Sequence, residues 1–265
     1  FAVYGNRKYF TDKKRGVVLR LSGGAGGGNG ITEISLYGMH DFFRDELSNL
    51  SVDKIVGSWN NHTKDYNISI QTSTTYKTLT FDEGVLGWTT FLDFKPSQAF
   101  SLNNLYYTFN SGKLYQHYLG PYARFYGVTY PSDVTVVLNS NPSVVKNFKT
   151  INYEGASGWE LESMIGSSGD VTLPIGVYQP QTSLVGLESA LFSNNFKKRE
   201  NKFFANLINN SPSATGEVIW GNSMTGIKGF YSTVKMSISA ITQFDTSAIK
   251  KELFSVSSDV VESSY

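Results

Sequence analysis

Short runs of alternating apolar and polar residues dominate this chain and predict β-strands. Between Tyr76 and Tyr118, four such runs follow one another with turn residues between them. They are expected as strands at Tyr76–Phe81, Gly87–Phe94, Tyr106–Phe109 and Lys113–Tyr118. The runs are too short and too rich in aromatic and β-branched residues for helices. Four strands in roughly forty residues is the spacing of one β-propeller blade, and an ordinary antiparallel sandwich would show the same pattern.

The same alternation predicts further strands on both sides of this stretch. They are expected at Arg15–Leu21, Ile31–Ser35, Ile55–Trp59, Tyr66–Gln71, Asp133–Leu138, Trp159–Met164, Lys202–Ile208 and from Tyr231 onward. In the last of these strands, Val234, Met236 and Ile238 should share one buried face. The first half contains one helical pattern, Gly38–Leu50, whose apolar residues recur at helical spacing and should pack against a sheet.

Together these elements predict a mainly β fold, built from β-propeller-like blades of antiparallel strands that form a complete or an incomplete propeller. One short helix and an extended C-terminal strand and tail complete the expected fold. Residues 1–164 are expected to form the propeller-like β domain. Residues 165–195, rich in Gly, Ser and Pro, should form an irregular excursion, and residues 196–265 a C-terminal β segment and tail.

Composition favours a protein that works through buried contact surfaces rather than through charge. The 23 Lys and Arg residues oppose 22 Asp and Glu, and the net charge of +1 gives no general attraction to nucleic acid or anionic membranes. Charged residues make up 17%, below the roughly 25% of typical soluble domains, while aromatic residues make up 14%. The absence of cysteine excludes disulfides and thiolate metal sites. Because the sequence opens on Phe1 rather than Met, we expect a fragment or a processed product.

No group of residues in the sequence predicts catalysis, a cofactor or a metal. The glycine-rich segment Ser22–Gly30 has neither the G-x-G-x-x-G spacing nor a following Lys-Ser/Thr pair, so we expect a flexible loop rather than a phosphate cradle. The histidines, His40, His62 and His117, have no partners at ligand spacing. We therefore predict a protein that is not an enzyme and has no catalytic, cofactor-binding or metal-binding residues.

One segment comes close to a known motif. Thr80–Trp88 is similar to the Asp box of sialidase propellers, S-x-D-x-G-x-T-W, with Thr in place of Ser and the aromatic residue displaced by one position. In that family the box is a structural turn, so the similarity supports a blade rather than an active site. The adjacent carboxylates of Asp82 and Glu83 would point to opposite faces of a strand and make a poor glycosidase pair. A polysaccharide-degrading enzyme is therefore the least favoured function.

The C-terminal segment supplies the candidate partner contacts. Phe254 and Val256 alternate with polar residues, Val260 follows them, and Tyr265 ends the chain. A weakly apolar extension of this kind docks on a partner chain in some proteins and is a frayed tail in others. We predict that Phe254, Val256, Val260 and Tyr265 contact a partner.

Seven stretches, taken in order, carry a pattern that covers nearly the whole chain. They are Tyr4–Ser22, Gly30–Leu47, Gly87–Pro96, Ser101–Tyr118, Asn141–Gly155, Gly226–Met236 and Lys250–Tyr265, with gaps at Gly120–Pro131 and Ile165–Ser193. Together they resemble the C-terminal part of a family of tailed-bacteriophage virion proteins, similar to the nozzle or muzzle proteins of short-tailed phages, including crAss-like phages. The resemblance implies a β-propeller-like domain and a structural role, with copies forming a ring around the channel through which the genome leaves.

The resemblance favours a non-enzymatic structural component of a phage tail or neck, located in the virion. Its partners would be copies of itself in a ring, other tail or neck proteins and, at most, genomic DNA that passes without specific contacts. Neither a membrane nor a cofactor is expected. The alternative is a carbohydrate-binding receptor module of a tail tip or fibre, in which exposed rings of Trp59, Trp88, Trp159 and Trp220 would stack on sugars.

Overall fold

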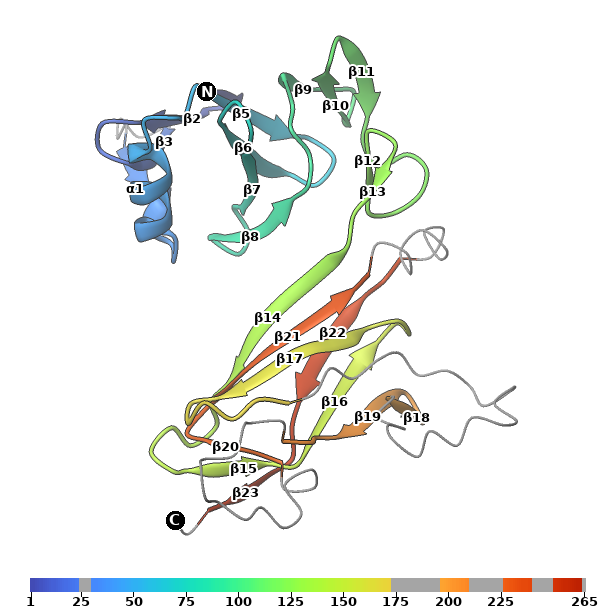
Figure 1. Cartoon of the computed structure of the whole chain (residues 1–265). Coiled ribbons are helices and arrows are strands. Elements are labelled where there is room, and N and C mark those ends of the chain that lie inside the picture. The colour runs from blue at the N-terminus through green and yellow to red at the C-terminus, as the bar shows by residue number, and fades with distance from the viewer. Residues whose placement is uncertain (24–29, 173–195, 210–225, 240–249, 264–265) are drawn as a thin grey trace. The chain divides into compact units, whose positions relative to one another are not determined.

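The computed structural model of the chain describes residues 1–23, 30–172, 196–209, 226–239 and 250–263 (Figure 1). These residues divide between two compact units. The first unit is Phe1–Gly120 with Arg124–Val128, and the second is Pro121–Ala123 with Thr129–Tyr265. The described part of the chain contains one α-helix among many short strands, and its sheets pair these strands antiparallel. The predicted mainly β fold with antiparallel sheets is confirmed.

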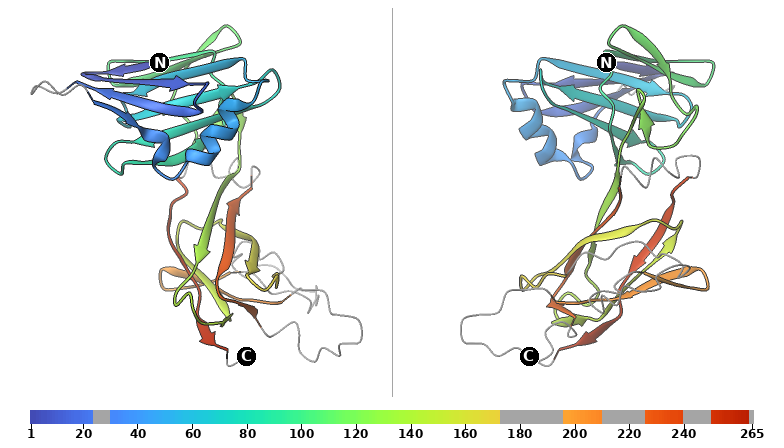
Figure 2. Two further views of the ribbon diagram at one scale, coloured as in Figure 1. Left: turned by 90° about the vertical axis from the view of Figure 1, so that its left-hand side faces the viewer. Right: turned by 45° about the vertical axis from the view of Figure 1, so that its right-hand side comes forward.

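Three meander sheets follow one another in the first unit, each with its strands in chain order (Figures 1 and 2). The first sheet is β1 (Ala2–Tyr4), β2 (Arg7–Asp12), β3 (Val17–Ser22) and β4 (Gly30–Glu33). The second sheet is β5 (Lys54–Asn60), β6 (Asp65–Gln71), β7 (Tyr76–Asp82) and β8 (Gly87–Leu92). The third sheet is β9 (Gln98–Leu102), β10 (Leu105–Asn110) and β11 (Lys113–Gln116), and the short pair β12 (Arg124–Phe125) and β13 (Val128–Thr129) comes next.

Successive sheets of the first unit meet through their first strands. Strand β1 contacts β5, and β5 contacts β9. A cavity of about 370 Å³ lies among these strands, lined by residues 1–5, 57–59, 61 and 99–101. In a β-propeller, blades of four strands are arranged around a central channel, and this arrangement of first strands resembles part of one. None of the described sheets closes into a ring, so the propeller itself stays a prediction.

The stretch between Tyr76 and Tyr118 forms its strands as predicted but does not form a single four-stranded blade. Strands β7 and β8 complete the second sheet, whereas β10 and β11 belong to the third. The sequence pattern did not predict β9, a short strand that begins soon after Pro96. A tight turn follows β9 at Asn103 and Asn104, which both have positive φ. Because β9 pairs with β10, the break between sheets falls at residues 93–97.

The predicted helix forms and fills space beside the first two sheets. After a short 3₁₀ turn at Ile34–Leu36, helix α1 spans His40–Ser48 and buries Phe43 and Leu47 completely. Leu50, expected on the same face, lies beyond the helix end and is 96% exposed. The core of the first unit consists of Ala2, Tyr9, Val18, Ile34, Phe43, Leu47, Val52, Trp59, Tyr66, Ile68, Ile70, Leu79 and Phe81.

The second unit packs three further sheets around its own core. One sheet has the order β14 (Ser132–Leu138), β21 (Ser232–Ile238) and β17 (Glu160–Gly166). The next has β18 (Lys197–Arg199), β19 (Lys202–Asn206), β16 (Thr150–Gly155) and β22 (Leu253–Ser257), and the last has β20 (Ile227–Gly229), β15 (Lys146–Phe148) and β23 (Val260–Glu262).

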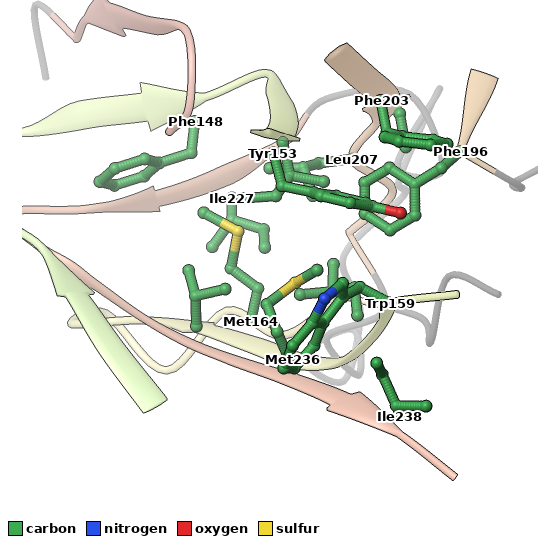
Figure 3. Close-up of a cluster of buried hydrophobic side chains, with 14 residues drawn as sticks. Phe148, Tyr153, Trp159, Met164, Phe196, Phe203, Leu207, Ile227, Met236 and Ile238 are labelled. Atoms are coloured by element: carbon green, nitrogen blue, oxygen red, sulfur yellow. The ribbon is translucent and has the colours of Figure 1, made fainter. Parts of the chain in front are cut away.

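Side chains from these sheets interdigitate in one apolar cluster (Figure 3). Val234, Met236 and Ile238 are fully buried there, which confirms their predicted common face. Tyr153 stacks on Phe203 with ring centres 4.7 Å apart and meets Phe196 edge-on at 4.9 Å. Such offset and edge-on aromatic pairs add to the stabilisation from burial alone.

The expected boundary at residue 164 lies inside the second unit. Strand β14 precedes this position and β17 spans it, and both pair with β21, which begins more than sixty residues after it. Antiparallel pairing thus joins Ser132–Leu138, Glu160–Gly166 and Ser232–Ile238 in one sheet. Most of the expected excursion, residues 173–195, lies outside the described residues. Just before it, Ile165 at the end of β17 forms an isolated antiparallel bridge with Val171.

Candidate interaction surface

One face of the third sheet carries large apolar side chains without a covering layer among the described residues. Alternation along the strands places Gln98, Phe100, Leu102, Leu105, Tyr107, Phe109, Leu114 and Gln116 on this face, which we call the β9–β11 outer face. Phe100 stacks on Tyr107 at 5.5 Å and lies 5.9 Å from Phe109. None of the positions holds a charged residue. Contiguous exposed apolar patches are rare on monomeric proteins and mark interaction sites.

Exposure confirms that this face is open within the first unit. Leu102 and Leu114 are 58% and 54% exposed, and Phe100 is 38% exposed. On the opposite face, Tyr106 and Thr108 are fully buried. The third sheet therefore buries one face through polar contacts and leaves an apolar face open.

On the buried face of the third sheet, polar side chains hydrogen-bond to one another among packed aromatic rings. The hydroxyls of Tyr106 and Ser58 hydrogen-bond at 2.7 Å, joining the third sheet to the second. Thr108 Oγ1 lies 2.7 Å from His117 Nε2 and 2.9 Å from the hydroxyl of Tyr126. Burial lowers the pKa of His117 to about 4, so its imidazole is neutral at pH 7. A neutral ring with this hydroxyl partner is a packing element rather than a proton donor to a substrate.

A second polar cluster joins the first sheet to the second. Glu83, in the β7–β8 turn, accepts a hydrogen bond from the Tyr9 hydroxyl at 2.5 Å and another from the Arg20 guanidinium. Arg7 lies 3.4 Å from the same carboxylate. The Arg20 and Glu83 side chains are only 14% and 11% exposed. Burial and the adjacent carboxylate raise the pKa of Tyr9, which keeps its hydroxyl protonated as a donor.

Asp82, the other acidic residue of the Asp-box-like segment, holds the turn itself. Its Oδ1 accepts backbone hydrogen bonds from Gly84 at 2.6 Å and Val85 at 3.1 Å. An Asp that bonds the backbone two and three residues ahead is a turn-forming residue. With Glu83 bound to Tyr9, both carboxylates of this segment have structural partners.

The remaining histidines lie apart from any group of metal ligands. His40 is half exposed, with Glu33 at 3.9 Å and Asp41 at 3.5 Å. His62 stacks on Tyr118 with ring centres 4.4 Å apart. Across the described ranges, no three His, Cys, Asp or Glu side chains come close enough to hold a metal ion. Nor does any helix in these ranges have the length and apolarity needed to cross a membrane.

The described tryptophans pack into the interior. Trp59 is 7% exposed and stacks on Tyr4 at 4.2 Å, and Trp159 is 6% exposed. Trp88 packs against the first core, and its Nε1 donates to the Ile34 carbonyl at 3.0 Å. Trp220 lies outside the described residues. Sugar stacking needs a free ring face, so these positions weigh against the carbohydrate-binding alternative for Trp59, Trp88 and Trp159.

The C-terminal residues predicted to contact a partner are strand residues of the second unit. Phe254, on β22, is 72% exposed, and Val260, on β23, is 37% exposed. Val256 instead packs against the second core, because β22 pairs with β16 and turns this side chain inward. Tyr265 lies outside the described residues. A partner contact through Phe254 and Val260 stays a prediction.

A β-rich protein with an uncharged exposed sheet face has the properties of a component of a larger assembly. Comparison with known proteins points the same way. Residues 120–210 match the family of the crassvirus muzzle protein C-terminal domain. The chain is also 30% identical over 125 residues to the Muzzle protein of Bacteroides phage crAss001. That alignment covers 44% of this chain and 9% of the phage protein.

The family match falls on the second unit. It runs from the start of that unit through β19, and it crosses both gaps that the seven resembling stretches leave. The predicted resemblance to a crAss-like phage tail protein is confirmed. Because the chain spans about 9% of the length of the relative, the activity and partners of a whole muzzle protein are matters for proposal.

Proposed function

We propose that this chain is a non-enzymatic structural part of a crAss-like phage tail, of the nozzle or muzzle type, and that it acts in the virion through protein interfaces. The observation that carries the proposal is the match of residues 120–210 to the muzzle protein C-terminal domain. The packing of the site residues supports it, because His117, Asp82 and Glu83 have structural partners within the fold.

Copies of the chain form a ring around the DNA exit channel and contact other tail or neck proteins. Two properties support this arrangement. The β9–β11 outer face offers apolar area for association, as interface centres do when charged residues are depleted. The net charge of +1 leaves no strong field for phosphates, so DNA would pass along the protein without being held.

Immunogold labelling of purified particles of the phage that encodes this chain tests the location. An antibody raised against the second unit should place gold at the tail, and an antibody against the major capsid protein serves as the control that labels the head. Intact tails should also yield peptides of this chain by mass spectrometry. Intact particles that lack both the label and the peptides would contradict the proposed role in the virion.

A further inference from the structure

We propose that the β9–β11 outer face binds the outer face of the first sheet of a second copy of this chain, head to tail. This inference rests on the proposed structural role and names the surfaces that would join neighbouring copies. Its starting point is the stacking already present within one copy, where each meander sheet lies against the next. After the third sheet, the first unit as described has only the short pair β12 and β13, whose turn residue Tyr126 bonds to Thr108 on the buried face of the third sheet.

The second sheet packs against the first and the third sheets through its two opposite faces. Tyr9 of the first sheet stacks on Tyr66 of the second at 4.5 Å, and Trp59 of the second accepts a bond through its carbonyl from Ser101 of the third at 2.7 Å. The Ser58–Tyr106 bond adds a buried contact between the second and third sheets. Among the described residues of the first unit, the series therefore leaves one face open at each end, on the first sheet and on the third.

The uncovered face of the first sheet is also mainly apolar. Strand register and alternation place Val3, Phe10, Leu19, Leu21 and Ile31 on it, opposite to Tyr9, and we call it the first-sheet outer face. Val3 is 50% and Ile31 is 63% exposed, while the others are partly buried. The face also carries charges of both signs: Lys8 lies in the row that joins Val3 to Leu21, Glu33 lies beside Leu19, and Asp12 lies at the end of β2.

Contact between the two outer faces would bring no like charges together, because only the first-sheet outer face carries charged residues. The β9–β11 outer face has no charge to oppose Lys8, and its two glutamines offer amide oxygens that an ammonium group can bind. The aliphatic part of a lysine side chain can cover apolar surface while its charge stays near water.

A head-to-tail contact accounts for both faces, whereas pairing of two β9–β11 outer faces would leave both first-sheet outer faces open. It also continues the order of sheets, with the first sheet of one copy following the third sheet of its neighbour. Such heterologous contacts repeat from copy to copy and produce either a closed ring or an open filament. The ring of the proposed function is the closed case.

Two exposed positions allow the contact to be tested without disturbing the fold. Leu114→Lys changes the β9–β11 outer face, and Ile31→Lys changes the first-sheet outer face. Val85→Lys, at a residue that is 71% exposed in the β7–β8 turn, is the matched control. Sedimentation of each purified chain over a range of concentrations gives its association state, and circular dichroism checks that each variant is folded.

We expect the wild type and Val85→Lys to associate equally, and each face variant to associate at least about tenfold more weakly, since a buried unpaired charge opposes the contact. An equimolar mixture of the two face variants should form a dimer and stop there, because one intact face of each kind remains available. A monomeric wild type, unchanged association of both variants, or loss of association in Leu114→Lys alone would overturn the proposal.

The outcomes for the two proposals can be told apart. If immunogold places the chain in the tail but sedimentation shows no head-to-tail contact, the tail role stands and this contact fails. If the chain associates as expected but is absent from particles, the contact stands and the virion role fails. The mixture of variants is the decisive sample, because neither isologous pairing nor non-specific aggregation produces a dimer from two monomeric partners.

Discussion

Acidification should destabilise the third sheet of the first unit, because the fold holds His117 in its neutral form. His117 directly follows β11, and its ring lies 4.7 Å from Phe94 and 6.0 Å from Phe125 between ring centres. Burial lowers its pKa from 6.5 to about 4 in the folded chain. In the unfolded chain the same ring takes up a proton near pH 6.5. Between these values the unfolded state binds more protons, so the free energy of unfolding falls as the pH falls.

The two pKa values set the size of this effect. At pH 7.5 the ring is neutral in both states, and His117 adds no pH dependence. At pH 5 the unfolded ring is mostly charged and the folded ring mostly neutral, which lowers the free energy of unfolding by about 2 kcal/mol. Since the His117 side chain is partly exposed, solvent screening makes this figure an upper value.

Hydrogen exchange of the β10 and β11 amides at pH 7.5 and pH 5 measures the free energy of opening this sheet. The wild type should lose stability on acidification, and His117→Gln should lack that component, since an amide can still bond to Thr108 but does not titrate. His62→Gln, at an exposed histidine, is the control and should behave as the wild type does. The same pH dependence in wild type and His117→Gln would refute the assignment.

Two further changes test buried charges of the first unit. Glu83→Gln should lower its free energy of unfolding by about 3 kcal/mol in urea titrations, because Arg20 would remain buried without its carboxylate. Glu46→Gln should cost less, because the Glu46–Lys77 pair is more exposed; equal losses would contradict the role of Glu83 as the partner of a buried Arg20. Burial raises the pKa of Asp65, so wild-type stability falls as pH rises through that raised pKa. Asp65→Asn should therefore unfold at a higher urea concentration at pH 7, and an unchanged midpoint would count against a buried charge there.

Clean alternation and helical spacing predicted many of the individual elements, although not β9. The buried row of Val234, Met236 and Ile238 follows from a period of two residues. The helix followed from Phe43 and Leu47 at a spacing of four. Alternation identifies a strand but does not select its neighbour, which is why the stretch 76–118 divides between two sheets.

Contacts that depend on distant pairing had no signal in the sequence. Glu83 meets Tyr9 across 74 residues and Arg20 across 63, and nothing local marks these residues as partners. Val256 shows the same limit, because alternation predicted an apolar side but did not say that this side would face the core. The sequence did contain a signal for the β9–β11 outer face. Leu105, Tyr107 and Phe109 are apolar at every second position, and Tyr106 between them is aromatic as well, so large apolar side chains fall on both sides of the strand.

The second unit differs from the first in the sequence distance that its sheets must close. Meanders of the first unit pair neighbours in the chain, whereas the Ser257 hydroxyl bonds to Asn152 across 105 residues. Closing so long a loop lowers the entropy of the chain before the contact can stabilise it, and sheets of high contact order therefore form slowly. During synthesis the first unit can fold while the ribosome is still translating the second, but β16 and β15 wait for the last strands, β22 and β23. The second unit is thus completed only after its C-terminal strands are made, and these late strands are where premature termination would do the most damage.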